Sequence, residues 1–94
     1  MSFIHSNALR LEDVPQSDAN INEISRFAIT FDVSEVGEAG KNLSLDSDFS
    51  QLTLPELRCI LYVEQRRWNH FNRAYDAQVE QKLRDIVSNI RASL

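Results

Sequence analysis

The chain has 94 residues, of which 43% are hydrophobic and 26% charged, which argues for one folded domain over residues 1–94 and against wholesale disorder. No apolar run approaches the roughly 18 residues that span a bilayer, and the start lacks the pattern of a secretory signal. The single Cys59 excludes a disulfide framework or a multi-cysteine zinc site. The net charge of −4 is uneven, because residues 1–50 carry nine acidic and three basic side chains. We expect a soluble cytoplasmic protein without membrane contact, whose acidic half repels phosphate backbones.

The first segment, residues 1–16, has scattered apolar positions and no sustained period. Pro15 marks its boundary. We expect an arm that packs across the helices through Leu9 and Leu11.

The next segment, residues 20–33, fits two structures. Phe27, Ile29, Phe31 and Val33 alternate as in a strand, which makes an α+β fold with a strand over 24–33 the alternative. Asn20 followed by Glu23 has the spacing of a helix cap, and no other segment offers a convincing partner strand. These observations favour a helix near 20–31, although Ile29 fits that helix poorly.

Residues 34–51 contain both glycines and many Ser and Asp residues. This composition is typical of an irregular connector, with one helical turn near Glu35 to Ala39. Three apolar side chains should tether the connector to the core: Leu43, Leu45 and Phe49.

The clearest local signal begins the next helix. Thr53 and Glu56 form a capping box, and Pro55 lies in the first turn, so a helix should start at Leu54. No Gly or Pro follows Pro55. A single long helix would leave its apolar stripes without a partner, so we predict a helical hairpin over about 54–71 and 76–92, with a break near Asn72. The fold class is therefore mainly α, a small helical domain.

The last helix should carry a narrow apolar seam. Its members are spaced in alternating steps of four and three residues: Val79, Leu83, Ile86 and Ile90. The seam is interpreted as core, with a dimer interface as the alternative.

A projection at about 100° per residue divides residues 54–73 into two sides. The apolar side should be core, with Trp68 and Phe71 as its anchors. The opposite side carries arginines with Cys59, Tyr62 and Val63 among them, so it is less polar than a freely solvated surface. Either another element covers it, such as the 1–16 arm, or a second chain does. The candidate interaction residues are Tyr62, Arg66, Arg67, His70 and Arg73; the alternative is a solvated side whose arginines pair with acids of the first half.

Glu64 falls in the middle of the predicted apolar side. Because an unpaired buried carboxylate is costly, we expect Glu64 to pair with Arg67, to accept the indole N–H of Trp68, or to meet another cation such as Arg26. We interpret it as a buried polar anchor that fixes helix register. The functional alternative is a catalytic acid or base.

No motif for phosphate, dinucleotide or calcium binding is found, and no His-Glu-x-x-His pattern. His5 and His70 are far apart in sequence, and Cys59 lies roughly 16 Å from His70 along one helix. We therefore expect no metal, no cofactor and no enzymatic activity.

These observations predict a non-catalytic protein–protein interaction domain, with a homodimer as the simplest instance. It would bind through the outer side of helix 54–71 or through the C-terminal seam. The alternative is a nucleic-acid-binding or regulatory module that binds through the arginine-rich helix. The overall acidity of the chain disfavours this alternative. A third class is a small enzyme or accessory subunit centred on Glu64 and His70.

Overall fold

The computed structural model describes residues 9–71 and 76–94, apart from the side chains of Ala39 and residues 68–71. Within these residues the chain is helical and contains no strand, so the prediction of a mainly α fold is confirmed. The α-helices are α1 (Ile21–Ala28), α2 (Leu54–Phe71) and α3 (Ala77–Ala92). In the described residues, 3-10 helices lie before α1 and between α1 and α2: η2 (Leu11–Asp13), η3 (Val33–Glu35), η4 (Gly37–Asn42) and η5 (Phe49–Gln51).

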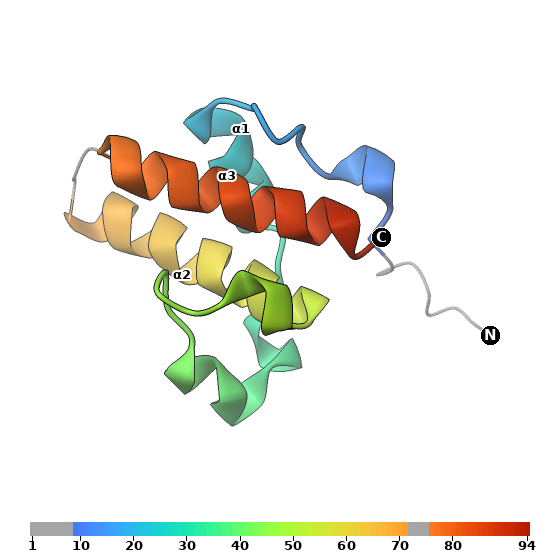
Figure 1. The fold of residues 1–94 in the computed structure, drawn as a ribbon. Coiled ribbons are helices and arrows are strands. Elements are labelled where there is room, and N and C mark those ends of the chain that lie inside the picture. Colours follow the sequence, from blue (N-terminus) through green and yellow to red (C-terminus); the bar gives the residue numbers. More distant parts are fainter. Residues whose placement is uncertain (1–8, 72–75) are drawn as a thin grey trace.

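Helix α2 is the central element of the fold. It packs beside α3 as the predicted antiparallel hairpin, and α1 crosses behind the pair (Figure 1). The 3-10 helices η3 and η4 pack on α2 as well. In Figure 1 these short helices lie below α2, on the side away from α3. Helix α2 is thus enclosed on several sides, and the position of each of its residues decides whether that residue reaches solvent.

Helix α1 settles the ambiguity over residues 20–33. Its cap is the predicted one, because Asn20 Oδ1 accepts the Glu23 N–H at 3.0 Å. The helix ends at Ala28, earlier than the predicted 31. The strand alternative is wrong: alternation would place Phe27, Ile29 and Val33 on one face, but Phe27 is 7% exposed while Ile29 and Val33 are 55% and 45% exposed.

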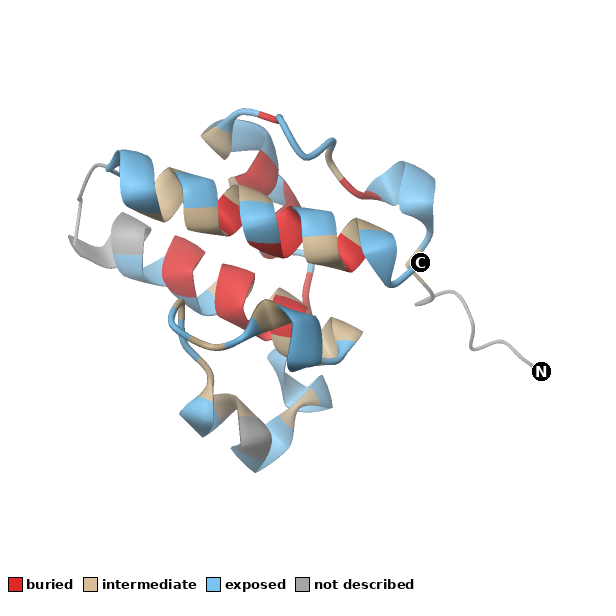
Figure 2. Cartoon of the chain, viewed as in Figure 1, coloured by how far each residue is buried: buried red, intermediate tan, exposed pale blue. Residues whose placement is uncertain are grey.

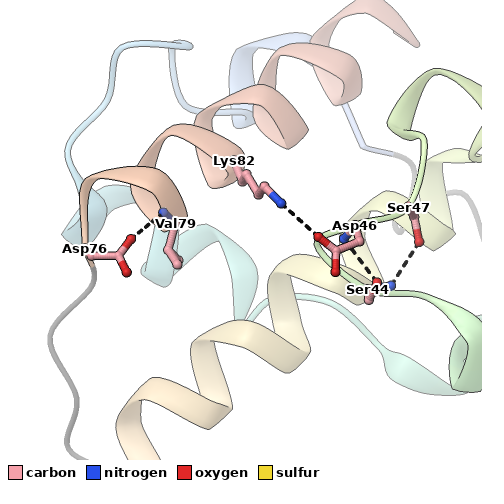
Figure 3. A network of polar contacts seen from close by, with 6 residues as sticks. All are labelled: Ser44, Asp46, Ser47, Asp76, Val79 and Lys82. Atoms are coloured by element: carbon pink, nitrogen blue, oxygen red, sulfur yellow. Dashed lines mark hydrogen bonds and ion pairs between the residues drawn. The ribbon is translucent and has the colours of Figure 1, made fainter.

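Both helices of the hairpin begin at side-chain caps, and the cap of α2 is the predicted one. Thr53 N–H donates to Glu56 Oε1 at 2.8 Å, and Glu56 N–H donates to Thr53 Oγ1 at 3.3 Å, which completes the capping box. Helix α3 begins at Ala77 because Asp76 Oδ1 accepts the Val79 N–H at 2.9 Å (Figure 3). The predicted break at Asn72 lies outside the described residues, although α2 does end at Phe71.

The core lies between α1, α2 and α3, and Figure 2 shows its buried residues along the facing sides of α2 and α3. The predicted seam of α3 belongs to this core. Leu83, Ile86 and Ile90 are at most 3% exposed, and Val79 packs at the edge. Burial of large aliphatic side chains contributes roughly 1.5–3 kcal/mol each. The seam is therefore occupied by the chain's own helices, as the core interpretation expected.

The described part of the N-terminal arm packs through one of its two predicted residues, Leu9, and through Val14. Leu9 packs against the core, but Leu11 is 47% exposed, so its expected packing is wrong. Val14, 5% exposed, is buried instead. Arg91 fixes the arm to α3, because its Nη1 donates to the carbonyl oxygens of Val14 at 3.1 Å and Pro15 at 3.2 Å. The arm is held by two aliphatic side chains, Leu9 and Val14, and by hydrogen bonds from Arg91 to its backbone.

The connector 34–51 is more ordered than predicted, since it contains η4, η5 and most of η3. Leu43, Leu45 and Phe49 pack against the core as expected. Gly37 has a φ of 54°, a left-handed conformation that glycine adopts at little cost.

The turn over residues 44–47 ties the connector to α3. Ser44 N–H donates to Ser47 Oγ at 3.0 Å, and Asp46 N–H donates to Ser44 Oγ at 3.1 Å (Figure 3). Lys82 Nζ on α3 pairs with Asp46 Oδ1 at 3.0 Å.

None of the helices in residues 9–71 and 76–94 combines the length and the hydrophobicity needed to cross a membrane.

Candidate interaction site

The side of α2 that the sequence places outward is divided into a covered part and an open part. In the covered part, Cys59 is only 3% exposed. Its cover is η4, because a Cβ on Gly40 would come within 3.2 Å of Cys59 Sγ. Burial raises the pKa of the Cys59 thiol, so the thiolate is disfavoured. The apolar character of this side is thus explained at Cys59 by the connector and not by the N-terminal arm.

The open part follows directly along α2, and we call it the open face, defined by Tyr62, Val63, Arg66 and Arg67. Val63, a large aliphatic side chain, is 42% exposed. The ring of Tyr62 meets the ring of Phe31 edge-on, with centroids 6.3 Å apart and planes at 66°. The guanidinium of Arg66 lies 5.8 Å from the centroid of the Tyr62 ring. An ordered aromatic ring with an arginine against it is the composition that recurs at protein interfaces.

Glu64 is buried and paired, as the sequence predicts. It is 7% exposed, and Arg67 Nη1 lies 3.2 Å from Glu64 Oε2. The Arg67 side chain is 64% exposed, so the guanidinium bridges a buried carboxylate and solvent. Of the other two predicted partners, Trp68 has its side chain outside the described residues, and none of the ion pairs between described residues joins Arg26 to Glu64. The contact with Arg67 supports the structural interpretation of Glu64 as a buried polar anchor.

A small pocket opens beside the open face, between α2 and the chain from η4 to Ser44. Its volume is about 240 Å³. Its apolar walls are Leu43, Ile60 and Val63, with Gly40 and Cys59 between them. Its polar lining residues are Lys41, Ser44, Glu64 and Arg67. We call this cavity the α2–η4 pocket.

Between Leu57 and Arg67, the charged side chains of α2 that reach solvent are all positive. Arg66 and Arg67 are exposed and Arg58 is half-buried, whereas Glu64, the acid between Leu57 and Arg67, is buried. Arg58, Arg66 and Arg67 therefore form a basic strip along α2, in which Arg67 is paired with Glu64, on a chain whose net charge is −4. Such a strip attracts negatively charged groups.

Two of the predicted interaction residues lie beyond what the structure describes. The backbone of His70 belongs to α2, but its side chain is outside the described residues, and Arg73 is outside them entirely. The same holds for the side chains of Trp68 and Phe71. Their predicted inward orientation stays a prediction.

Sequence reasoning missed the role of Arg58. Its guanidinium lies 5.1 Å from the Phe27 ring centroid and 5.3 Å from that of Phe31, and its Nη2 donates to Thr30 Oγ1 at 2.8 Å. Burial lowers the pKa of Arg58, and attraction to Glu35 partly offsets that effect. Arg58 thereby joins α1 to α2. No local pattern could indicate these contacts, because Phe31, Thr30 and Phe27 lie 27 to 31 residues earlier in the chain.

Gln65 was missed as well. It is 9% exposed, on the flank of α2 next to Glu64. Two adjacent buried polar residues in a central helix are uncommon, because burying each costs free energy unless it is hydrogen-bonded. A helical wheel gives the direction of a side chain but does not show which other elements cover it. It therefore could not predict that Gln65, on the flank of α2, is buried.

A second concave surface lies between the arm and α1. It is a wide groove of about 740 Å³ whose charged lining residues have both signs: Glu12, Asp13, Glu23, Arg26 and Arg58. The mixture leaves no net preference for an anion or a cation. In the described part of the chain, no three His, Cys, Asp or Glu residues converge as a metal site would require.

Comparison with protein-family models, with curated proteins and with solved structures gives no match, so the function is argued from the residues of this chain alone.

Proposed function

We propose that this chain is a non-catalytic protein–protein interaction domain that binds through the open face of α2. The observation that carries the proposal is Val63, an exposed aliphatic side chain flanked by the stacked Tyr62–Arg66 pair and by the Arg67 guanidinium. Apolar contact area next to ordered aromatic and arginine side chains is the pattern of interface hot spots.

Because the C-terminal seam is buried, we propose the open face of α2 and not the seam as the binding surface. Because Leu83, Ile86 and Ile90 are in the core, a partner that used the seam would have to displace the chain's own helices. The open face needs no such rearrangement. The partner is a protein or a second copy of this chain, in a cytoplasmic setting, and no cofactor is needed for a contact of this kind.

Three arginines on one helix support few phosphate contacts. A protein partner is therefore proposed in preference to a nucleic acid.

The test compares two matched pairs of substitutions in the full chain. Val63→Asp with Arg66→Glu alters the open face, and Ile29→Asp with Arg26→Glu makes the same chemical changes on exposed residues of the α1 side. Sedimentation velocity measures self-association, and affinity capture from the native host with quantitative mass spectrometry measures binding of other proteins. We expect an association of the wild-type chain that the first pair abolishes and the second retains. An association that both pairs retain equally would refute the open face as the binding surface.

A further inference from the structure

We propose that the partner presents an acidic segment with one aliphatic side chain, which enters the α2–η4 pocket while its carboxylates pair with basic groups around the pocket. This inference rests on the proposed function and specifies the chemistry of the partner. The argument starts from the pocket, because the pocket adjoins the open face and shares Val63 and Arg67 with it.

The inner surface of the pocket suits a small aliphatic group. Leu43 and Ile60 form its walls, and Val63 forms part of its edge at 42% exposure. Entry of an aliphatic side chain would remove apolar surface of Val63 from water, at a gain of roughly 25 cal/mol per Å² buried. A strongly polar side chain would gain less, because the pocket's buried carboxylate, Glu64, is already paired with Arg67.

The groups at the mouth of the pocket suit carboxylates. Arg67 uses Nη1 for Glu64, and its side chain is 64% exposed, so other N–H donors of its fork can reach a bound carboxylate. Lys41 Nζ lies 2.7 Å from Glu38, but both side chains are largely exposed, at 74% and 84%, and such pairs exchange partners at little cost. Arg66 adds a third positive charge one turn from Val63 on the same side of α2.

Charge decides between an acidic partner and a second copy. A symmetric dimer through the open face would place Arg66 and Arg67 of one copy against the same residues of the other, which like-charge repulsion opposes. An acidic segment of another protein meets no such repulsion. Charge complementarity thus favours an acidic segment of another protein, with one aliphatic side chain in the α2–η4 pocket.

The experiment titrates short synthetic peptides into the isotope-labelled full chain and follows backbone amide shifts. The first probe is rich in Asp and Glu around a central leucine. The second replaces that leucine with serine, and the third replaces the acids with lysines. We expect the first probe to shift amides of residues 40–44 and 59–67, with a Kd roughly tenfold lower than that of either control probe. Val63→Asp and Arg66→Glu should each weaken this binding, whereas Ile29→Asp and Arg26→Glu should not.

Three results would overturn the inference: equal affinity for the leucine and serine probes, shifts centred on the groove at Arg26, or unchanged binding in Val63→Asp. If the first probe fails to bind while the open-face pair of substitutions still abolishes association of the whole protein, the chemistry proposed here is wrong and the proposed function stands. If that pair has no effect on association either, both are wrong. Spectra of each variant that retain native dispersion confirm that the comparison is made between folded proteins.

Discussion

Arg67 and Glu64 form an ion pair, with Nη1 3.2 Å from Oε2, in which the carboxylate is buried and the guanidinium reaches solvent. The pair stands at the boundary between the core of the domain and the open face of α2. It makes the buried acid tolerable, and it also positions a cation beside the α2–η4 pocket. On the proposed function, this one ion pair would contribute both to the stability of the fold and to the binding of a partner.

Removing the carboxylate should destabilise the fold in a graded manner. Glu64→Gln retains the side-chain volume and one acceptor, so we expect a loss below about 1 kcal/mol. Glu64→Ala also leaves a cavity, and we expect a loss of roughly 1–2 kcal/mol. Urea denaturation measures both. Melting temperatures equal to wild type for the two variants would remove Glu64 as a buried polar anchor.

Arg58 should contribute more to stability than an arginine on the surface. Arg58→Ala removes its contacts with Phe27 and Phe31 and its hydrogen bond to Thr30, so we expect a loss of roughly 1–2 kcal/mol. Arg26→Ala, at an exposed position of α1, is the matched control and should cost less than about 0.5 kcal/mol. Equal losses for the two variants in chemical denaturation would contradict the role assigned to Arg58.

Gly40 and Cys59 should be energetically coupled. A Cβ at position 40 would lie 3.2 Å from Cys59 Sγ and 3.3 Å from a methyl group of Val36, so Gly40→Ala requires these neighbours to move. With Cys59→Ala in the background, the sulfur is absent and the substitution should cost less. A double-mutant cycle by denaturation should give a coupling of roughly 0.5–1 kcal/mol. Strict additivity would show that η4 does not pack on Cys59 in solution.

The ionisation of Cys59 should make the wild-type chain less stable in alkali. Burial raises the pKa of the folded thiol above that of the unfolded chain, which titrates at about 8.5. The contribution of the neutral thiol is fully present below that pH and is lost progressively as the pH rises through the folded pKa. The stability advantage of wild type over Cys59→Ala should therefore shrink between neutral pH and about pH 10. An advantage that does not change over this range would contradict burial of the thiol.

The parts of the fold that were predictable depend on neighbours in sequence. The caps at Asn20 and Thr53 each act within three residues, so the sequence contains both partners of each contact. The core position of the seam on α3 follows from helical period, because one buried side repeats along the helix. The start of α2 could be read from its capping box, and its division from α3 from the need of each apolar stripe for a partner.

The parts that were missed depend on contacts between distant segments. The cover over Cys59 comes from η4, whose sequence has no hydrophobic period that would reveal a packing side. Phe31 is buried beyond the end of α1, where no helical pattern applies, and there it meets Tyr62 and Arg58. The candidate site was only partly predictable for the same reason. Tyr62, Arg66 and Arg67 were identified from composition. The adjoining pocket could not be predicted, because it depends on how the connector runs past α2.

Site-specific photo-crosslinking in the native host tests the central claim, that a partner protein contacts the open face of α2, most directly. A photo-reactive amino acid is placed at Val63 in one variant and at Ile29 in a matched variant, since both side chains are exposed and aliphatic. We predict a crosslinked protein species from Val63 and none from Ile29. Crosslinking that is equal at the two positions, or that occurs only from Ile29, would contradict the proposed surface.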